Sequence, residues 1–149
     1  MELALFQPEI PQNTGTLIRL CACMGIGLHV IFPCGFVFRD KHLQRASLDY
    51  KDMASVLFHE AWETFVDAME DRRLILLTPS ASSSHIDFSF EKKDCLILGR
   101  ESSGFPASLL ESMPHQVKIP MVSGMRSLNV AISGAMVLSE ALRQTHLYP

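Results

Sequence analysis

Residues 95–106 read CLILGRESSGFP, and this stretch decides the fold class. Its first part, residues 95–99, is a nearly continuous apolar run, which is typical of a strand buried on both faces of a parallel sheet. Its second part is a polar loop with a glycine and a proline near its end. Because ligands of parallel α/β sheets bind outside the carboxyl ends of the strands, this loop is a candidate part of a binding site.

Similar short runs rich in Leu, Ile and Val recur along the chain. They predict strands at residues 3–6, 28–32, 74–78 and 117–119, and a weaker one at 54–59. Amphipathic segments between them predict helices at residues 13–25, 60–71 and 106–113, and a last helix at about 127–144. Strands that alternate with helices indicate an α/β fold with a mostly parallel sheet and flanking helices. The length fits one domain that covers residues 1–149.

Three residues give further detail on the helices. Gly25 is expected to end the first helix. Pro106 is expected at the first helical position of the third, where proline costs least. Trp62 belongs to an apolar stripe of the second helix, so we expect it in the core and not as a stacking platform.

The composition is that of an ordinary globular protein, with 48% hydrophobic and 19% charged residues. The longest uncharged stretch of a predicted helix, residues 127–139, is shorter than the roughly 20 apolar residues of a membrane span. The first residues carry Glu2 and only a short apolar run, which predicts no signal peptide. We therefore expect a soluble, cytoplasmic protein without a membrane partner.

Cysteine and histidine spacing does not indicate a metal site. Cys21, Cys23, Cys34 and Cys95 form no CxxC pair, and the six histidines show no ligand spacing. Each cysteine lies in or beside an apolar segment, which predicts a structural role as a small hydrophobic residue in a reducing compartment.

The common nucleotide and hydrolase signatures are missing from the chain. It has no GxGxxG, no GxxxxGK[ST] and no GxSxG. The net charge of −3 argues against tight, sequence-independent binding of nucleic acid. Residues 39–51, RDKHLQRASLDYK, are nonetheless basic, and they fit either a solvated helix face or a local nucleic-acid contact.

Strong hydrogen-bonding side chains gather where predicted strands end. Each has a structural alternative: Asn13 could cap a helix, Arg19 could lie on the surface, and Glu101 could pair with any cation. Ser127 and Asn129 could cap the last helix. All five at one end of one sheet favour a ligand site.

Three segments resemble the motifs of the SpoU group of the SPOUT superfamily of RNA 2′-O-ribose methyltransferases. NTGTLIR at 13–19 is similar to the first motif, LGRESSGFP at 98–106 to the second, and MRSLNVAIS at 125–133 to the third. The motifs follow one another in the family's order, and the resemblance covers nearly the full chain.

The resemblance implies a deep trefoil knot in the C-terminal part of the α/β fold, an exception to the general absence of knots. It also implies S-adenosylmethionine held mainly by backbone groups, at positions that correspond to Leu77, Gly99, Ile119 and Ser127. A homodimer is implied, with the active site near the subunit interface. The small residues Ala131, Ser133, Gly134 and Ala135 would permit close helix approach, either between subunits or within one chain.

The reaction implied is methylation of the ribose 2′-hydroxyl of nucleotide 34, the wobble nucleotide, of leucine tRNAs. Arg19 would act at the 2′-hydroxyl, and because a guanidinium does not readily lose its proton, we expect it to anchor phosphate and stabilise the developing alkoxide. Asn13, Glu101 and Asn129 would hold Arg19 and the cofactor in register, and residues 39–51 would contact the anticodon stem-loop. Two alternatives stay open: methylation at another tRNA or rRNA position, and a knotted RNA-binding module without catalysis.

Overall fold

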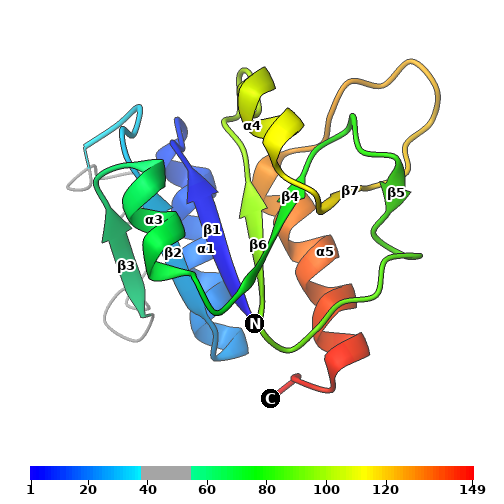
Figure 1. The fold of residues 1–149 in the computed structure, drawn as a ribbon, viewed down its shortest axis with the longest axis horizontal. Helices are drawn as coiled ribbons and strands as arrows, with labels where there is room; N and C mark the ends of the chain where they lie inside the picture. Colours follow the sequence, from blue (N-terminus) through cyan, green and yellow to red (C-terminus); the bar gives the residue numbers. More distant parts are fainter. Residues whose placement is uncertain (38–54) are drawn as a thin grey trace.

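The computed structural model describes residues 1–37 and 55–149, and seven strands of these residues form one sheet (Figure 1). The strand order is β3-β2-β1-β6-β4-β7-β5, and all six neighbouring pairs are parallel. The strands are β1 (Glu2–Phe6), β2 (Gly27–Ile31), β3 (Val56–His59), β4 (Arg73–Leu77), β5 (Ser83–Ser84), β6 (Asp94–Leu98) and β7 (Gln116–Lys118).

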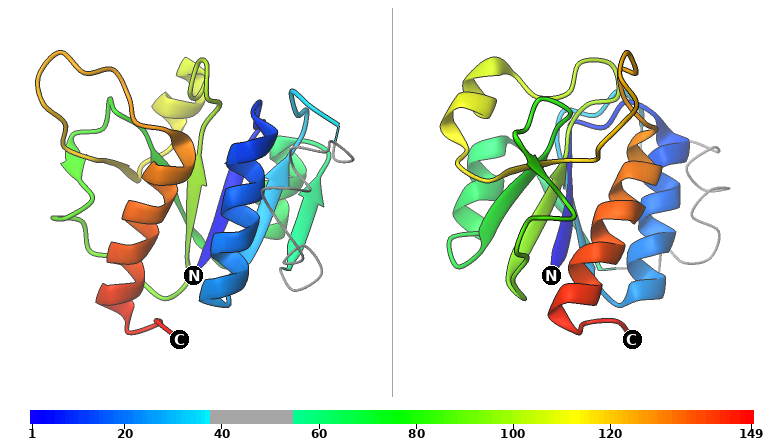
Figure 2. Two further views of the ribbon diagram at one scale, coloured as in Figure 1. Left: turned by 180° about the vertical axis from the view of Figure 1, so that it is seen from behind. Right: turned by 90° about the vertical axis from the view of Figure 1, so that its right-hand side faces the viewer.

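Helices cover both faces of this sheet. Within residues 1–37 and 55–149 they are α1 (Pro11–Met24), α3 (Trp62–Ala68), α4 (Ala107–Ser112) and α5 (Val130–Thr145). Helices α1 and α5 lie side by side on one face, and α3 and α4 lie on the other (Figures 1 and 2). The predicted α/β class, with a parallel sheet and flanking helices, is therefore confirmed. Among the described helices, none combines the length and apolar composition that a bilayer crossing requires.

The core has two halves because successive strand residues point to opposite faces. On β1, Leu3 and Leu5 belong to the cluster beneath α1 and α5, whereas Ala4 and Phe6 belong to the cluster beneath α3 and α4. All five residues of the central strand β6 are buried. Its carboxyl end, where the loop of residues 99–104 begins, is thus held on a rigid support.

All four predicted helix starts differ from the structure by one to three residues: α1 begins two residues earlier than predicted, and α3, α4 and α5 begin later. The last helix begins at Val130 and not near residue 127, because Asn129 has a non-helical backbone (φ −55°, ψ 136°) and acts as its N-cap. Pro106 precedes the first helical residue of α4 and is its N-cap. The stop at Gly25 is confirmed, since this residue adopts the left-handed conformation with φ 64°.

The remaining fold predictions have mixed outcomes. The weak strand at 54–59 is confirmed by β3, whereas the two-residue β5 is absent from the prediction. Trp62 is only partly buried, but it packs edge-on against Phe6 with ring centroids 5.8 Å apart. All four cysteines are free; Cys21 and Cys95 are buried as predicted, but Cys23 is exposed, so the packing role predicted for it is wrong.

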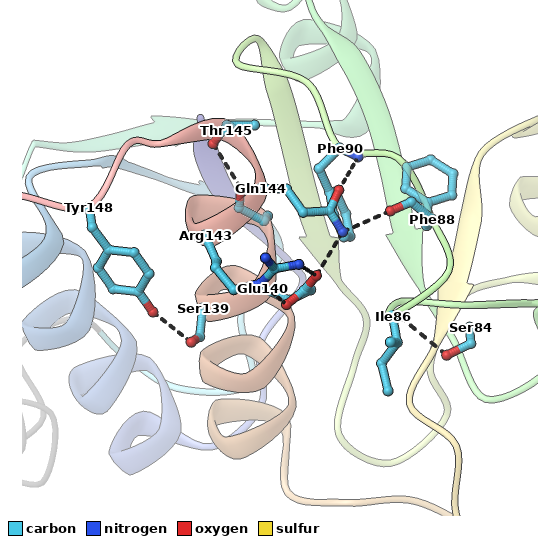
Figure 3. Close-up of polar contacts among 11 residues, drawn as sticks. Ser84, Ile86, Phe88, Phe90, Ser139, Glu140, Arg143, Gln144, Thr145 and Tyr148 are labelled. Atoms are coloured by element: carbon cyan, nitrogen blue, oxygen red, sulfur yellow. Dashed lines mark hydrogen bonds and ion pairs between the residues drawn. The ribbon is translucent and has the colours of Figure 1, made fainter.

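The C-terminal half of α5 is fastened to the segment that leads into β6 (Figure 3). The Gln144 amide nitrogen donates to the Phe88 carbonyl over 3.0 Å, and its oxygen accepts from the Phe90 backbone N–H over 2.9 Å. Within α5, the Gln144 amide nitrogen also donates to the Glu140 carboxylate over 2.8 Å. The two bonds to residues 88 and 90 join α5 to the segment before β6.

Candidate active site

A cavity of about 680 Å³ opens at the carboxyl ends of β4, β6 and β7. Its volume lies within the range of roughly 300–1,000 Å³ that is usual for small-molecule and cofactor sites. Four of its lining residues are those predicted to hold a cofactor, namely Leu77, Gly99, Ile119 and Ser127. The four positions that the family resemblance implies come from separate segments, and the fold brings them to one cavity.

Three polar side chains of the cavity wall form a hydrogen-bonded chain. The Asn129 amide nitrogen donates to the Asn13 side-chain oxygen over 2.9 Å, and the Asn13 amide nitrogen donates to the Glu101 carboxylate over 3.2 Å. Asn13 is only 8% exposed. The chain links the starts of α5 and α1 to the loop after β6, and it therefore unites the three sequence motifs.

The structural alternative for Asn13, a helix cap, is wrong. Helix α1 begins at Pro11 and its N-cap is Ile10, so Asn13 lies in the first turn and its side chain caps nothing. The Glu101 carboxylate instead accepts the backbone N–H groups of Glu9 and Ile10, over 2.8 and 3.3 Å. A carboxylate is favourable there because the N-terminus of a helix carries partial positive charge.

Asn129 caps α5 and also contacts Asn13. Its side-chain oxygen caps α5 by accepting from the backbone N–H groups of Ala131 and Ile132, over 2.9 and 3.3 Å, while its amide nitrogen binds Asn13. Ser127 lies two residues before this cap and lines the cavity. The cap therefore belongs to Asn129, and Ser127 is left to face the cavity.

Gly99 allows the loop after β6 to close tightly. A Cβ atom at Gly99 would lie 2.9 Å from the carbonyl carbon of Gly104 and 3.1 Å from the Phe105 ring. Two backbone hydrogen bonds between Arg100 and Gly104 close the turn, and Gly104 adopts a left-handed conformation with φ 66°. Only a residue without a side chain fits at position 99 in this turn.

Arg19 is the one predicted site residue that the structure does not bring to the cavity. It is exposed on α1 and is not among the cavity-lining residues, while Asn13, one and a half turns earlier, is. The basic stretch at 39–51 lies outside the described residues, so its predicted RNA contact is not addressed by the structure.

One thiol close to the site, that of Cys34, is influenced by the charge of Glu101. Burial, with a smaller contribution from the Glu101 charge, raises the pKa of the Cys34 thiol to about 12, so the thiol is neutral at physiological pH. Within residues 1–37 and 55–149, no three or more His, Cys, Asp or Glu side chains are grouped so that they could hold a metal ion.

Two residues of the site were not identified from the sequence. The Glu9 carboxylate accepts both the backbone N–H and the hydroxyl of Ser102, each over 2.8 Å. Glu9 and Ser102 are 93 positions apart, and they share only the property that each follows a strand that ends at this edge. That shared position was the signal available in the sequence.

Comparison with known proteins shows which family this chain resembles. The pattern of the SpoU rRNA methylase family matches residues 1–139. A tRNA (cytidine(34)-2′-O)-methyltransferase from Ancylobacter novellus is 46% identical over 147 residues, which cover 97% of this chain and 93% of that protein.

Solved structures agree with the sequence match. One that concerns the 2-OH methylation of C/U34 on tRNA is 36% identical, covers 96% of this chain and 94% of the other, and superposes with a TM-score of 0.92. A SpoU methyltransferase from Streptomyces viridochromogenes, solved in complex with AdoMet, is 25% identical with a TM-score of 0.87, over 97% of this chain and 60% of that one. The chain therefore belongs to the SpoU rRNA methylase family.

Proposed function

We propose that this chain is an S-adenosylmethionine-dependent methyltransferase that modifies the ribose 2′-hydroxyl of nucleotide 34 in tRNA, with leucine tRNAs as its substrates. Residues 1–149 would act as one catalytic domain, and the enzyme would work in the cytoplasm. The observation that carries the proposal is the meeting of the three family motifs in one hydrogen-bonded chain, Asn129 to Asn13 to Glu101, on the wall of the 680 Å³ cavity. The relative that is 46% identical bears the name of this activity.

The cavity suits the cofactor. Leu77, Leu98 and Ile119 offer apolar surface, as the flat base of a nucleoside requires, and Ser80, Ser103 and Ser127 supply hydroxyl groups at the rim. Leu77, Gly99, Ile119 and Ser127 are the residues that we propose to hold it. When bound, S-adenosylmethionine would supply a methyl group that ends on the ribose 2′-oxygen, while the hydroxyl proton is released and S-adenosylhomocysteine leaves.

The chain's own residues would contribute positioning and charge stabilisation. A ribose hydroxyl is a weak nucleophile, so most of the rate must come from alignment with the methyl group and from stabilisation of negative charge on oxygen. Asn13, Glu101 and Asn129 would fix the relative placement of α1, α5 and the loop after β6. Arg19 would bind the phosphate beside the target ribose and stabilise the oxygen during transfer.

We infer that the enzyme is a homodimer. Ile132 and Met136 are 54% and 41% exposed, and their spacing of four residues sets them on one side of α5. Leu128, just before the N-cap of this helix, is 41% exposed. Helix α1, on which Arg19 is exposed, lies beside α5 on the same face of the sheet (Figure 2). Gly134 instead faces the interior of its own chain, since a Cβ atom there would meet the side chains of Leu98 and Leu17.

The oligomeric state can be measured directly. Light scattering coupled to size exclusion should give a dimer for the unmodified protein and a monomer for Ile132→Asp, because a carboxylate cannot be buried unpaired in an apolar contact. The matched control is Arg143→Asp, an exposed position near the other end of α5. A monomeric unmodified protein would refute the dimer.

We also infer the trefoil knot. Strand β7 lies between β4 and β5 in the sheet, although the segment 78–93 that connects β4 to β6 contains β5. That segment is bound to α5 through Gln144, and the chain from β7 to α5 returns past it (Figures 2 and 3). An experimental structure in which residues 119–129 pass outside the loop formed by 78–93 would contradict the knot.

The activity is tested by incubating unmodified total tRNA with the protein and isotopically labelled S-adenosylmethionine, followed by mass-spectrometric mapping of 2′-O-methyl groups. We expect label at nucleotide 34 of leucine tRNAs. Label confined to another tRNA position, or to rRNA, would reject the wobble assignment. An absence of both transfer and cofactor binding would reject the enzyme.

A further inference from the structure

We propose that Glu9 is a positioning residue for the reaction, and that it acts by holding Glu101 and the turn of residues 100–104 in register with α1. This inference rests on the proposed function. Glu9 does not line the cavity, so it would act through residues that do.

The loops after β1 and β6 each place a carboxylate against donors of the other loop. The Glu101 carboxylate accepts the backbone N–H of Glu9 over 2.8 Å, and the Glu9 carboxylate accepts the backbone N–H and hydroxyl of Ser102, each over 2.8 Å. We call these contacts the Glu9–Glu101 clasp. Each loop both donates to and accepts from the other, so neither can shift without breaking hydrogen bonds to a charged group, which are stronger than neutral ones.

The clasp grips the turn at its tip. Backbone hydrogen bonds between Arg100 and Gly104 close the turn at its base, and Ser102 is its middle residue. At the base, the Arg100 guanidinium donates to the Gln7 side-chain oxygen, and it also lies over the Phe6 ring at 5.5 Å. Base and tip are thus both tied to the loop after β1, and Glu101 lies between them.

Glu9 is itself firmly placed. The Gly35 backbone N–H donates to the Pro8 carbonyl over 2.9 Å, and a Cβ atom at Gly35 would come within 2.9 Å of the Glu9 Cα. Hydrogen bonds from the Ser102 backbone and hydroxyl lower the pKa of Glu9 below its usual value, so it is ionised at neutral pH. The ionised form is the one that can accept both donors of Ser102.

The consequence for the reaction is a fixed Glu101. Its second oxygen accepts from Ile10 and from Asn13, the middle residue of the chain that ends at Asn129. If the clasp opens, Glu101 can turn away from Asn13 while the fold stays intact, because the core below the sheet edge does not depend on it. Small displacements of positioning groups are costly in rate.

Glu9→Gln tests the proposal. The glutamine amide has nearly the same shape, but its NH2 group replaces one of the two carboxylate oxygens and cannot accept a hydrogen bond from Ser102. At saturating cofactor and anticodon stem-loop RNA, we expect the turnover rate to fall by about tenfold, the scale of a lost hydrogen bond to a charged group, with the melting temperature nearly unchanged. Glu63→Gln, an exposed carboxylate on α3, is the matched control and should behave like the unmodified protein. An unchanged rate for Glu9→Gln would overturn the proposal.

A double variant separates positioning from a general structural effect. Because Glu9 acts through Glu101, adding Glu9→Gln to the Glu101→Gln variant should not lower its turnover rate further. If the two substitutions acted independently, their fold-losses in turnover rate would multiply. If Glu9→Gln does not fold, Ser102→Ala removes only the hydroxyl contact and should slow turnover by about threefold; an unmodified rate there would count against the clasp.

The proposed function can fail separately. If the unmodified protein transfers no methyl group to the RNA, that function is wrong, and calorimetry with S-adenosylmethionine then tests the clasp alone. Glu101 and Ser102 line the cavity, so Glu9→Gln should weaken binding by about threefold or more. Equal affinities would overturn the clasp.

Discussion

The side-chain amide of Asn129 donates a 2.9 Å hydrogen bond to Asn13 and so joins the first residue before α5 to the first turn of α1. The oxygen of the same amide caps α5 through the N–H groups of Ala131 and Ile132. Asn129 therefore stabilises a helix and aligns two motifs with different atoms, and the two roles can be separated by substitution.

Asn129→Asp keeps the cap oxygen but removes the donor to Asn13. The introduced carboxylate and that of Glu101 would then compete for the single Asn13 amide, so we expect stability within about 0.5 kcal/mol of the unmodified protein and at least a roughly tenfold loss of methyl transfer. Asn129→Ala should lose both the alignment and about 1 kcal/mol of stability. Urea denaturation and initial rates measure these effects, and a normal rate for the Asn129→Asp variant would show that the contact is only structural.

Arg19→Ala should fold and bind S-adenosylmethionine normally, since Arg19 is exposed and lies outside the cavity lining. We expect its turnover to fall by at least about 10²-fold, as removal of one charge-stabilising donor typically does. Arg19→Lys should recover only part of the rate, because an ammonium lacks the planar fork of donors. Turnover near that of the unmodified protein would remove Arg19 from the reaction.

Gly99→Ala should distort the cavity. Its new Cβ would meet the Gly104 backbone at 2.9 Å, so the turn must open, and we expect a loss of about 1–3 kcal/mol of stability with greatly weakened cofactor binding in calorimetry. Gly25→Ala is the control, because its cost of about 1 kcal/mol comes from a left-handed backbone with no atoms near the new Cβ. If both variants bind the cofactor equally well, Gly99 has no special place in the site.

Stability should decrease on mild acidification because of His29 and His59. The His29 Nδ1 and the His59 Nε2 lie 2.8 Å apart, and burial lowers the pKa of both histidines below the ordinary value. The unfolded chain takes up protons near pH 6.5 while the folded one does not, so the free energy of unfolding should fall as the pH drops from about 7.5 to below 6.5. Urea denaturation across this range should show that the free energy of unfolding of the His29→Gln variant depends less steeply on pH. An unchanged pH dependence would show that His29 is not a source of the effect.

Much of the fold follows from local sequence. Strands such as β6 are buried on both faces, and their continuous apolar runs are hard to mistake for anything else. The start of α5 does not follow from the apolar pattern, because Ser127 and Leu128 fit a helical pattern as well. The non-helical backbone of Asn129 sets the first helical residue at Val130. The two polar residues of β5 carry no strand signal at all.

The contacts within the candidate site could be anticipated where the residues belong to family motifs, but not where two loops cooperate. Asn13, Glu101 and Asn129 belong to motifs, and the structure joins them. Glu9 acts through Ser102, which is 93 residues away, and no periodicity or spacing encodes such a pairing. The cap assigned to Asn13 failed for a related reason, since the carboxylate of Glu101 from a distant loop occupies the start of α1.

The most direct test of the proposed activity compares two anticodon stem-loop RNAs of a leucine tRNA that differ by one oxygen atom. One carries ribose at nucleotide 34 and the other 2′-deoxyribose, and both are incubated with the protein and labelled S-adenosylmethionine. We expect stoichiometric label in the first RNA, mapped to nucleotide 34, and none in the second, because the acceptor oxygen is missing. Equal labelling of the two RNAs would contradict methylation of the wobble ribose.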